Sequence, residues 1–191
     1  MSMGKNEKGG LPKRLYLPER ATGRAWEGGG APDPLEDPQL YEGVPSRRVF
    51  AWLIDAMIML FLIVAIWALA GLVSVASLFT LGPLSIILAI FTVAFLPVLY
   101  HGYFIGAHGA SPGMSLLDLE VRSWTGDPPE LLQGYLHATL FVVTVAPSTW
   151  IVLLVAFMNE RRRCLHDYLA GTVVVRASRL AERAAGGLAA E

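Results

Sequence analysis

The sequence has a single cysteine in 191 residues, Cys164, and few charged side chains. One cysteine excludes a disulfide framework within the chain. Asp, Glu, Lys and Arg make up 16% of the residues, whereas a typical soluble domain has about 25%. The 15 basic and 16 acidic residues nearly balance. Because no basic excess is present to neutralise phosphates, we expect no nucleic-acid partner.

Charge is missing altogether from residues 56–117. A membrane-spanning helix needs about 20 mainly apolar residues, and this region together with the residues just before it contains two such segments, approximately 49–73 and 84–105. Neither segment has the polar stripe of a soluble surface helix. The connection, residues 74–83, contains Ser, Thr, Gly and Pro, which is typical of a turn. We therefore predict an antiparallel pair of spans, with the lipid bilayer as partner.

A third apolar stretch, residues 131–158, has no formal charge and contains Pro147 near its middle. Proline removes a helix hydrogen bond and clashes with the preceding turn, so this stretch is either one kinked span or a hairpin of two short helices. Lys and Arg that flank spans mark the cytoplasmic side. Arginines precede the first span and follow residue 160, which favours the hairpin. The predicted fold is an all-α, multi-pass transmembrane helical bundle with a cytoplasmic N-terminus.

The segments outside the apolar stretches divide the chain. Residues 1–43 are polar and contain many Gly and Pro residues, so we predict a disordered N-terminal tail. The transmembrane domain is expected over residues 44–176, and a C-terminal tail, as a surface or frayed helix, over residues 177–191. Residues 117–121 alternate apolar and polar side chains. This alternation favours a short strand or an interfacial segment, with a plain connecting loop as the alternative.

Three motifs with charged or glycine residues lie along this domain. The first is RVFAWLID, from Arg48 to Asp55. The second is GASPGM followed by LLDLEV, within residues 109–121, and the third is RCLHDYLAGTVVV, residues 163–175. In this order and spacing the chain resembles the RDD family of bacterial membrane proteins, which is named for one arginine and two aspartates. The resemblance covers roughly residues 44–176.

The resemblance places the family arginine on Arg48, the first aspartate on Asp55 and the second on Asp167. The family often has Thr and Lys in the middle motif, where this chain has Ser111 and Met114. The resemblance implies a small multi-pass protein of the bacterial plasma membrane. Transport has been suggested for the family, including cation/proton antiport in some members, and no catalytic chemistry is implied.

Asp55 is an ionisable group inside the first predicted span, where a charge is costly. It follows Arg48 by seven residues, which is nearly two helical turns, so both side chains share one face with Trp52. Reflection about the middle of the predicted hairpin places His101 at the depth of Asp55. We expect Asp55 to pair with His101, with a neighbouring tyrosine or with an arginine of the later motif. Asp167 is expected to bind backbone amides or to reach Arg48.

Two functions remain open. In the first, Arg48, Asp55, His101 and Asp167 form an intramembrane polar site that transports a small ion or solute, and so small a bundle would need to form a homo-oligomer. In the second, the chain is a non-catalytic scaffold or accessory subunit whose buried ion pair holds the helices together. Three arginines are expected to anchor the topology or to bind anionic lipid head groups: Arg161, Arg162 and Arg163.

The sequence lacks several motifs of enzymes and metal sites. It contains no G-x-x-x-x-G-K-[ST] phosphate loop and no H-E-x-x-H pair. Cys164, His166 and Asp167 are close in sequence, but no further ligands for a tetrahedral zinc site follow at a suitable spacing. We therefore expect no enzymatic activity, no metal and no cofactor.

Overall fold

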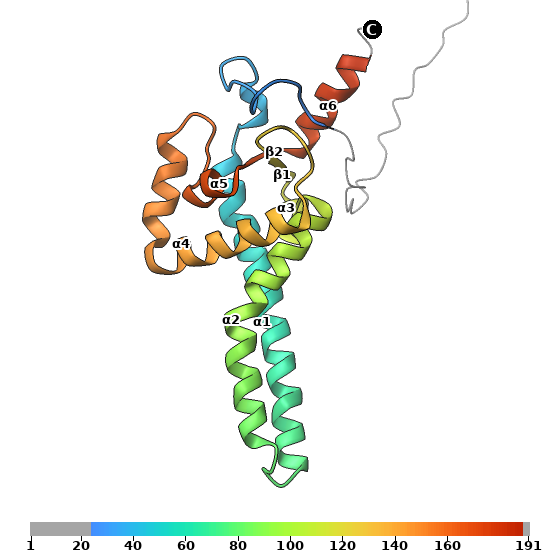
Figure 1. Ribbon diagram of the computed structural model, residues 1–191, viewed down its shortest axis with the longest axis vertical. Coiled ribbons are helices and arrows are strands. Elements are labelled where there is room, and N and C mark those ends of the chain that lie inside the picture. The colour runs from blue at the N-terminus through green and yellow to red at the C-terminus, as the bar shows by residue number, and fades with distance from the viewer. Residues whose placement is uncertain (1–23, 189–191) are drawn as a thin grey trace, which may run out of the picture.

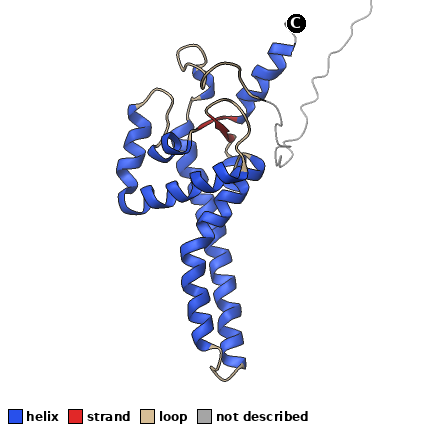
Figure 2. Ribbon diagram, viewed as in Figure 1, coloured by secondary structure: helices blue, strands red, loops and turns tan. Residues whose placement is uncertain are grey.

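The computed structural model describes residues 24–188, without the side chains of residues 146–154, 157 and 184–188. Most of this part of the chain is helical (Figures 1 and 2). In chain order the elements are η1 (a 3-10 helix, Pro38–Leu40), α1 (Val44–Ala76), α2 (Gly82–His108), α3 (Pro112–Leu116), β1 (Leu119–Ser123), α4 (Leu131–Met158), α5 (Leu165–Ala170), β2 (Thr172–Arg176) and α6 (Ala177–Leu188).

Helices α1 and α2 form the hairpin that the charge-free region predicts, and it extends away from a head built by the other elements (Figure 1). Both helices are long and apolar enough to cross a membrane, and only 6% of the most apolar window of each is buried. Large apolar side chains therefore face outward, as at Phe61, which is 73% exposed. An apolar surface of this extent requires lipid or another apolar partner around it.

Helix α4 differs from the preferred prediction for residues 131–158. Its backbone is helical from Leu131 to Met158 without interruption, with Pro147 inside. Figure 1 shows a sharp bend between two arms, of which the first crosses α2 and the second does not fold back along the first. The prediction of an antiparallel hairpin is therefore wrong. Proline can bend a helix without ending it, because only one or two of its hydrogen bonds are lost.

The first arm of α4 packs against α2 through glycines. A Cβ atom on Gly134 would lie 2.5 Å from the backbone nitrogen of Gly106 and 2.6 Å from the carbonyl oxygen of Gly102. Backbone atoms cannot turn aside as a side chain can, so glycine is needed for this approach. Gly102 and Gly106 have the small-x-x-x-small spacing that allows membrane helices to pack closely.

We expect Gly134→Ala to destabilise the protein by about 1–3 kcal/mol, since overpacking of a close contact has costs of this order. The measurement is the unfolding temperature of the full chain in detergent. The matched control is Gly71→Ala, also within a helix, where an added Cβ would meet nothing within 4 Å. Equal unfolding temperatures for the two variants would contradict the close packing of α2 and α4.

Strands β1 and β2 form a two-stranded antiparallel sheet in the head, with pairs from Leu119 and Arg176 to Ser123 and Thr172. β1 confirms that the alternating residues include a strand. β2 was not predicted, so the all-α prediction is corrected to a mostly helical fold with one small sheet (Figure 2). Both faces of the sheet are covered. Val121 and Val174 pack with buried residues of α1 and α2.

The other face of the sheet is covered by the segment before α1 and by α6. Trp26, Leu40 and Tyr41 are buried against Val173 and Val175. The prediction of a disordered tail is therefore wrong for residues 24–43, because their few large apolar side chains cover a sheet face that was not expected. Residues 1–23 lie outside the described residues. Residues 177–188 form a helix, as expected for the C-terminal segment, and residues 189–191 also lie outside the described part.

Candidate functional site

Arg48 and Asp167 form a buried ion pair between α1 and α5. The Nη1 group of Arg48 donates to Oδ2 of Asp167 at 2.6 Å, and the two side chains are 9% and 0% exposed. Asp167 is the third residue of α5, and the backbone N–H of Cys164 at the N-cap also donates to its Oδ2, at 2.8 Å. The structure thus provides both contacts expected for Asp167.

The charge of Asp167 is stabilised by these neighbours. Burial alone would raise its pKa, but the positive charge of Arg48, with smaller contributions from His166 and His137, holds the pKa at about 2. The carboxylate is therefore ionised at any physiological pH. The ion pair fixes the guanidinium of Arg48 beside α5, where Nη1 also contacts the sulfur of Cys164 at 3.3 Å.

Asp55 lies in a second buried cluster, which we call the Asp55 clamp: Asp55, Tyr100, Ser111 and Gly113. Its Oδ1 accepts from the hydroxyl of Tyr100 at 2.9 Å and from the N–H of Gly113 at 2.8 Å, and its Oδ2 accepts from the hydroxyl of Ser111 at 2.5 Å. The clamp joins α1, α2 and the N-terminus of α3. Of the expected partners, the structure provides the tyrosine. Among the described residues, no hydrogen bond joins Asp55 to His101 or to an arginine.

Two residues of the clamp come from the middle motif and were not predicted as partners of Asp55. Residues 109–113 also read Gly-Ala-Ser-Pro-Gly, which is the G-x-S-x-G spacing of a hydrolase nucleophile. Here Ser111 is fully buried, and its oxygen also accepts from the N–H of Met114 as the N-cap of α3. It follows a helix, whereas a nucleophile elbow follows a strand. We assign Ser111 a structural role.

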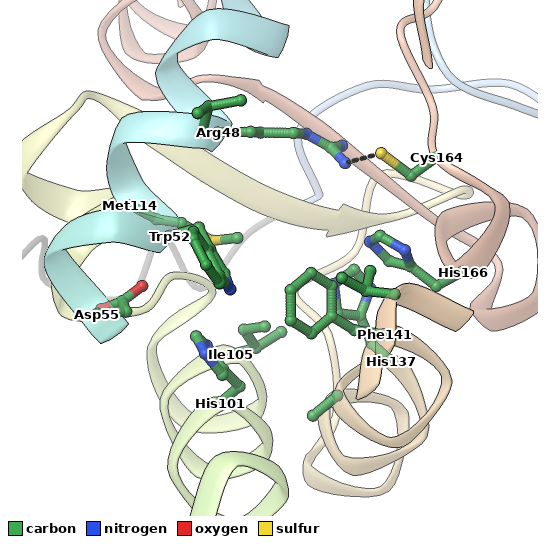
Figure 3. A pocket seen from close by; sticks show the side chains of 13 residues that line it. Arg48, Trp52, Asp55, His101, Ile105, Met114, His137, Phe141, Cys164 and His166 are labelled. Atoms are coloured by element: carbon green, nitrogen blue, oxygen red, sulfur yellow. Dashed lines mark hydrogen bonds between the residues drawn. The ribbon is translucent and has the colours of Figure 1, made fainter. Parts of the chain in front are cut away.

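A cavity of about 430 Å³ lies beside these clusters, between α1, α2, α4 and the start of α5 (Figure 3). Most of its wall is apolar, formed by Val49, Trp52, Ile105, Met114, Phe141 and Val145. Its polar lining residues are Arg48, Asp55, His101, His137, Cys164 and His166. Arg48, Trp52 and Asp55 all line it, so they do share one face of α1. Figure 3 shows His101 across the cavity from Arg48 and His166.

Several buried polar atoms at the cavity have no hydrogen-bond partner among the described residues. They are Nε and Nη2 of Arg48, Nε2 of His101, Nδ1 of His166 and, next to the cavity, Oδ1 of Asp167. Buried polar groups usually have partners, because an unsatisfied one costs about 1–3 kcal/mol. These atoms are therefore the ones at which a bound molecule would gain most.

His137, His166 and Asp167 bring two imidazoles and a carboxylate within 4.8 Å of one another. Oδ1 of Asp167 is 3.7 Å from Nδ1 of His137 and 3.6 Å from Nε2 of His166. These three could hold a metal by residue type and spacing. The guanidinium of Arg48 already neutralises the carboxylate, however, so the cluster offers a divalent cation no net negative charge. His137 was not predicted as a site residue, since a single histidine in an apolar segment follows no pattern. His166 was considered beside Cys164 and Asp167 and was not included, because the sequence shows no further ligands nearby.

The imidazole of His166 makes folding dependent on pH. Burial lowers the pKa of His166 from 6.5 to about 4, against the attraction of Asp167. The unfolded chain therefore binds this proton at a higher pH than the folded chain, and stability that is present above pH 6.5 is lost as the pH falls towards 4. One pKa unit corresponds to about 1.4 kcal/mol, so we expect His166 to account for a loss of about 2 kcal/mol between pH 7 and pH 5. His137, whose pKa burial lowers to about 3, adds to this loss in the wild type and in a His166 variant alike.

The measurement is the unfolding temperature in detergent at pH 7 and at pH 5. The variant His166→Gln should lose less stability over this interval, since glutamine does not titrate. Asp167 does not contribute in this range, because its pKa of about 2 and the usual 3.8 both lie below it. The same pH dependence in the variant and the wild type would contradict the assignment.

The three arginines after α4 have different surroundings. Arg163 is buried, donates to the carbonyl oxygens of Thr172 and Asp167 at 2.9 Å each, and stacks on Tyr168 with 4.0 Å to the ring centroid. The burial of Arg163 contradicts a contact with lipid head groups, and its side chain holds the turn between α5 and β2; its role as a topology anchor stays a prediction. For Arg161 and Arg162 both roles stay predictions.

The residues of both clusters lie within one region of sequence similarity. The model of the RDD family matches residues 43–171, from the N-cap of α1 to the end of α5. No curated protein and no solved structure matches the chain. Since the match covers more than half of the sequence, the chain belongs to the RDD family.

Proposed function

We propose that this chain is an integral membrane protein that transports a small ion or solute, with the cavity at Arg48 as its binding site. The observation that carries the proposal is a cavity of about 430 Å³ beside a buried guanidinium, two nitrogens of which have no hydrogen-bond partner in the part of the chain that the structure describes. Concave sites with apolar walls and a few convergent polar groups are where small molecules usually bind.

In this proposal Arg48, His101 and His166 contact the solute, and Asp167 positions Arg48. Asp55 is not a solute contact, because both of its oxygens already accept hydrogen bonds from the protein. Its role is to hold α1, α2 and α3 together. This division differs from the prediction, in which Asp55 belongs to the transport site together with Arg48, His101 and Asp167.

The membrane arrangement follows from the charges at the two ends of the hairpin. Arg47 and Arg48 lie in the first turns of α1, whereas the turn between α1 and α2 has no charged residue. By the positive-inside rule the head lies on the cytoplasmic side of the bacterial plasma membrane. One hairpin is too small to enclose a path across a bilayer, so transport requires several copies with their exposed apolar helices side by side.

A second candidate function is that of a non-catalytic scaffold or accessory subunit. It is favoured by the Asp55 clamp and the Arg48–Asp167 pair, which both join helices and use protein groups as partners. In that case the wild-type chain would produce no flux, and its variants would change abundance only.

The test measures flux of Na⁺, K⁺, H⁺ and a panel of small solutes in vesicles containing the purified chain. Ala138 is fully buried and lines the cavity, so Ala138→Leu fills space there without removing a polar group. We expect this variant to keep most of its membrane abundance and to lose at least tenfold in flux. Ala181→Leu, on the exposed surface of α6 and away from the cavity, is the control and should change neither. Flux no higher than in empty vesicles for every solute would contradict transport and favour the scaffold.

A further inference from the structure

Resting on the proposed binding site, we infer that its ligand is an amphiphile with one singly charged oxyanion head group, such as a carboxylate, on an apolar body. The head group binds the free edge of Arg48 and the apolar body lies against Trp52 and Phe141 (Figure 3).

The free edge of Arg48 selects the shape of the head group. Nη1 contacts Asp167 and Cys164, whereas Nε and Nη2 have no hydrogen-bond partner within the described residues. Nε and Nη2 form one edge of the planar guanidinium, and such an edge donates two parallel hydrogen bonds to two oxygens of one group. A carboxylate or a phosphate ester has this arrangement of oxygens. A single hydroxyl or a metal cation does not.

The charges around Arg48 limit the head group to a single negative charge. Asp167 already neutralises the guanidinium, and its side chain is fully buried. A doubly charged group would leave more than one negative charge uncompensated in a largely apolar cavity, which is costly. Nδ1 of His166 and Nε2 of His101, which also have no partner, provide further polar contacts for a single head group.

The apolar wall of the cavity favours a ligand whose body is apolar. Apart from the few polar groups, the cavity is lined by aliphatic and aromatic side chains (Figure 3). Burial of each CH₂ group in such a wall raises affinity about fourfold. A small hydrophilic anion would gain nothing from this surface.

Entry of the head group requires a movement of side chains. Nε and Nη2 of Arg48 have almost no exposed surface in the structure, so a ligand reaches them when a neighbouring side chain turns aside.

The experiment measures binding to the delipidated full chain in detergent by the change in tryptophan fluorescence, since Trp52 lines the cavity. The probes are octanoate, octanol with the same chain and no charge, acetate with the same head and no chain, and inorganic phosphate. We expect octanoate to bind at least tenfold more tightly than each of the others. Equal affinity for octanol would overturn the role of the head group, and equal affinity for acetate or phosphate would overturn that of the apolar body.

Arg48→Lys tests the contact itself, because lysine keeps a positive charge for Asp167 but lacks the edge with two nitrogens. We expect at least a tenfold loss of octanoate affinity with an unfolding temperature close to that of the wild type. The matched control is Arg47→Lys, whose arginine donates to the carbonyl oxygen of Leu117 and does not line the cavity. If Arg48→Lys bound octanoate as tightly as Arg47→Lys, the inference would be overturned.

Two sources of such a ligand are distinguished by a second arm. Mass spectrometry of organic extracts of the purified chain detects a fatty acid or single-charge lipid taken from the bilayer, and binding of dissolved octanoate detects a free solute. A positive result in either arm that is lost in Arg48→Lys supports the inference. If neither arm is positive while another solute shows flux that Ala138→Leu abolishes, the inference fails and the proposed function stands.

Discussion

Replacing Asp55 with alanine is expected to remove most of the folded protein from the membrane. The side chain is 1% exposed and accepts three hydrogen bonds, from Tyr100, Ser111 and Gly113. Each buried donor that loses its acceptor costs about 1–3 kcal/mol, and alanine leaves three of them without one. A loss of about 4 kcal/mol or more is a large part of the 5–15 kcal/mol that folded domains usually have. Membrane abundance and the unfolding temperature in detergent are the measurements.

Asp55→Asn is the matched control. The amide oxygen can still accept from Tyr100 and Gly113, and the amide nitrogen can donate to the oxygen of Ser111. We expect a smaller loss of stability than in Asp55→Ala, and flux retained in the variant that folds. Wild-type stability in Asp55→Ala would show that the clamp does not hold the helices. Loss of flux in a well-folded Asp55→Asn would return Asp55 to the transport site.

Separating Arg48 from Asp167 is expected to have the second large effect. Removal of one member of a buried ion pair leaves an uncompensated charge and costs about 3–5 kcal/mol. Arg48→Met leaves the carboxylate of Asp167 in a site that is 0% exposed, and Asp167→Asn leaves the guanidinium unpaired. Both variants should have much lower unfolding temperatures and reduced amounts in the membrane.

The double variant Arg48→Met with Asp167→Asn tests whether the two losses share one cause. It contains neither buried charge, and asparagine can still accept from the N–H of Cys164, as Asp167 does. We expect it to be more stable than Arg48→Met alone, because buried pairs can often be replaced by neutral groups at little cost. If the loss of stability in the double variant equalled the sum of the losses in the two single variants, the two residues would act independently.

The hairpin of α1 and α2 could be predicted because most of its sequence lacks charged residues. No charge interrupts residues 56–117, and this holds whatever the head looks like. The predicted ends were too short, since α1 begins at Val44, where Pro45 fits the first turn. β1 could be predicted from its alternation, but β2 could not, because Val173, Val174 and Val175 are all buried and give a continuous apolar run.

The residues of the candidate site could be predicted better than the contacts between them. The motifs identify Arg48, Asp55 and Asp167, and the structure shows that the arginine belongs with Asp167 while Asp55 belongs with the middle motif. Sequence separation carries no information on such a choice. The cavity, and the part of His137 in it, depends on how α4 crosses α2, which three glycines fix through close contacts that no periodicity reveals.

The 119 residues that separate Arg48 from Asp167 also set an order of events during synthesis. A ribosome adds about 5–20 residues per second, so Arg48 is made roughly ten seconds before its counter-ion exists. Over that interval the nascent hairpin is already complete and can enter the translocon, while its guanidinium must be solvated by water or by lipid phosphates. Assembly of the head therefore follows insertion of the hairpin. A chain truncated before α5 would be anchored in the membrane with an incomplete head, in which the guanidinium of Arg48 lacks its counter-ion Asp167.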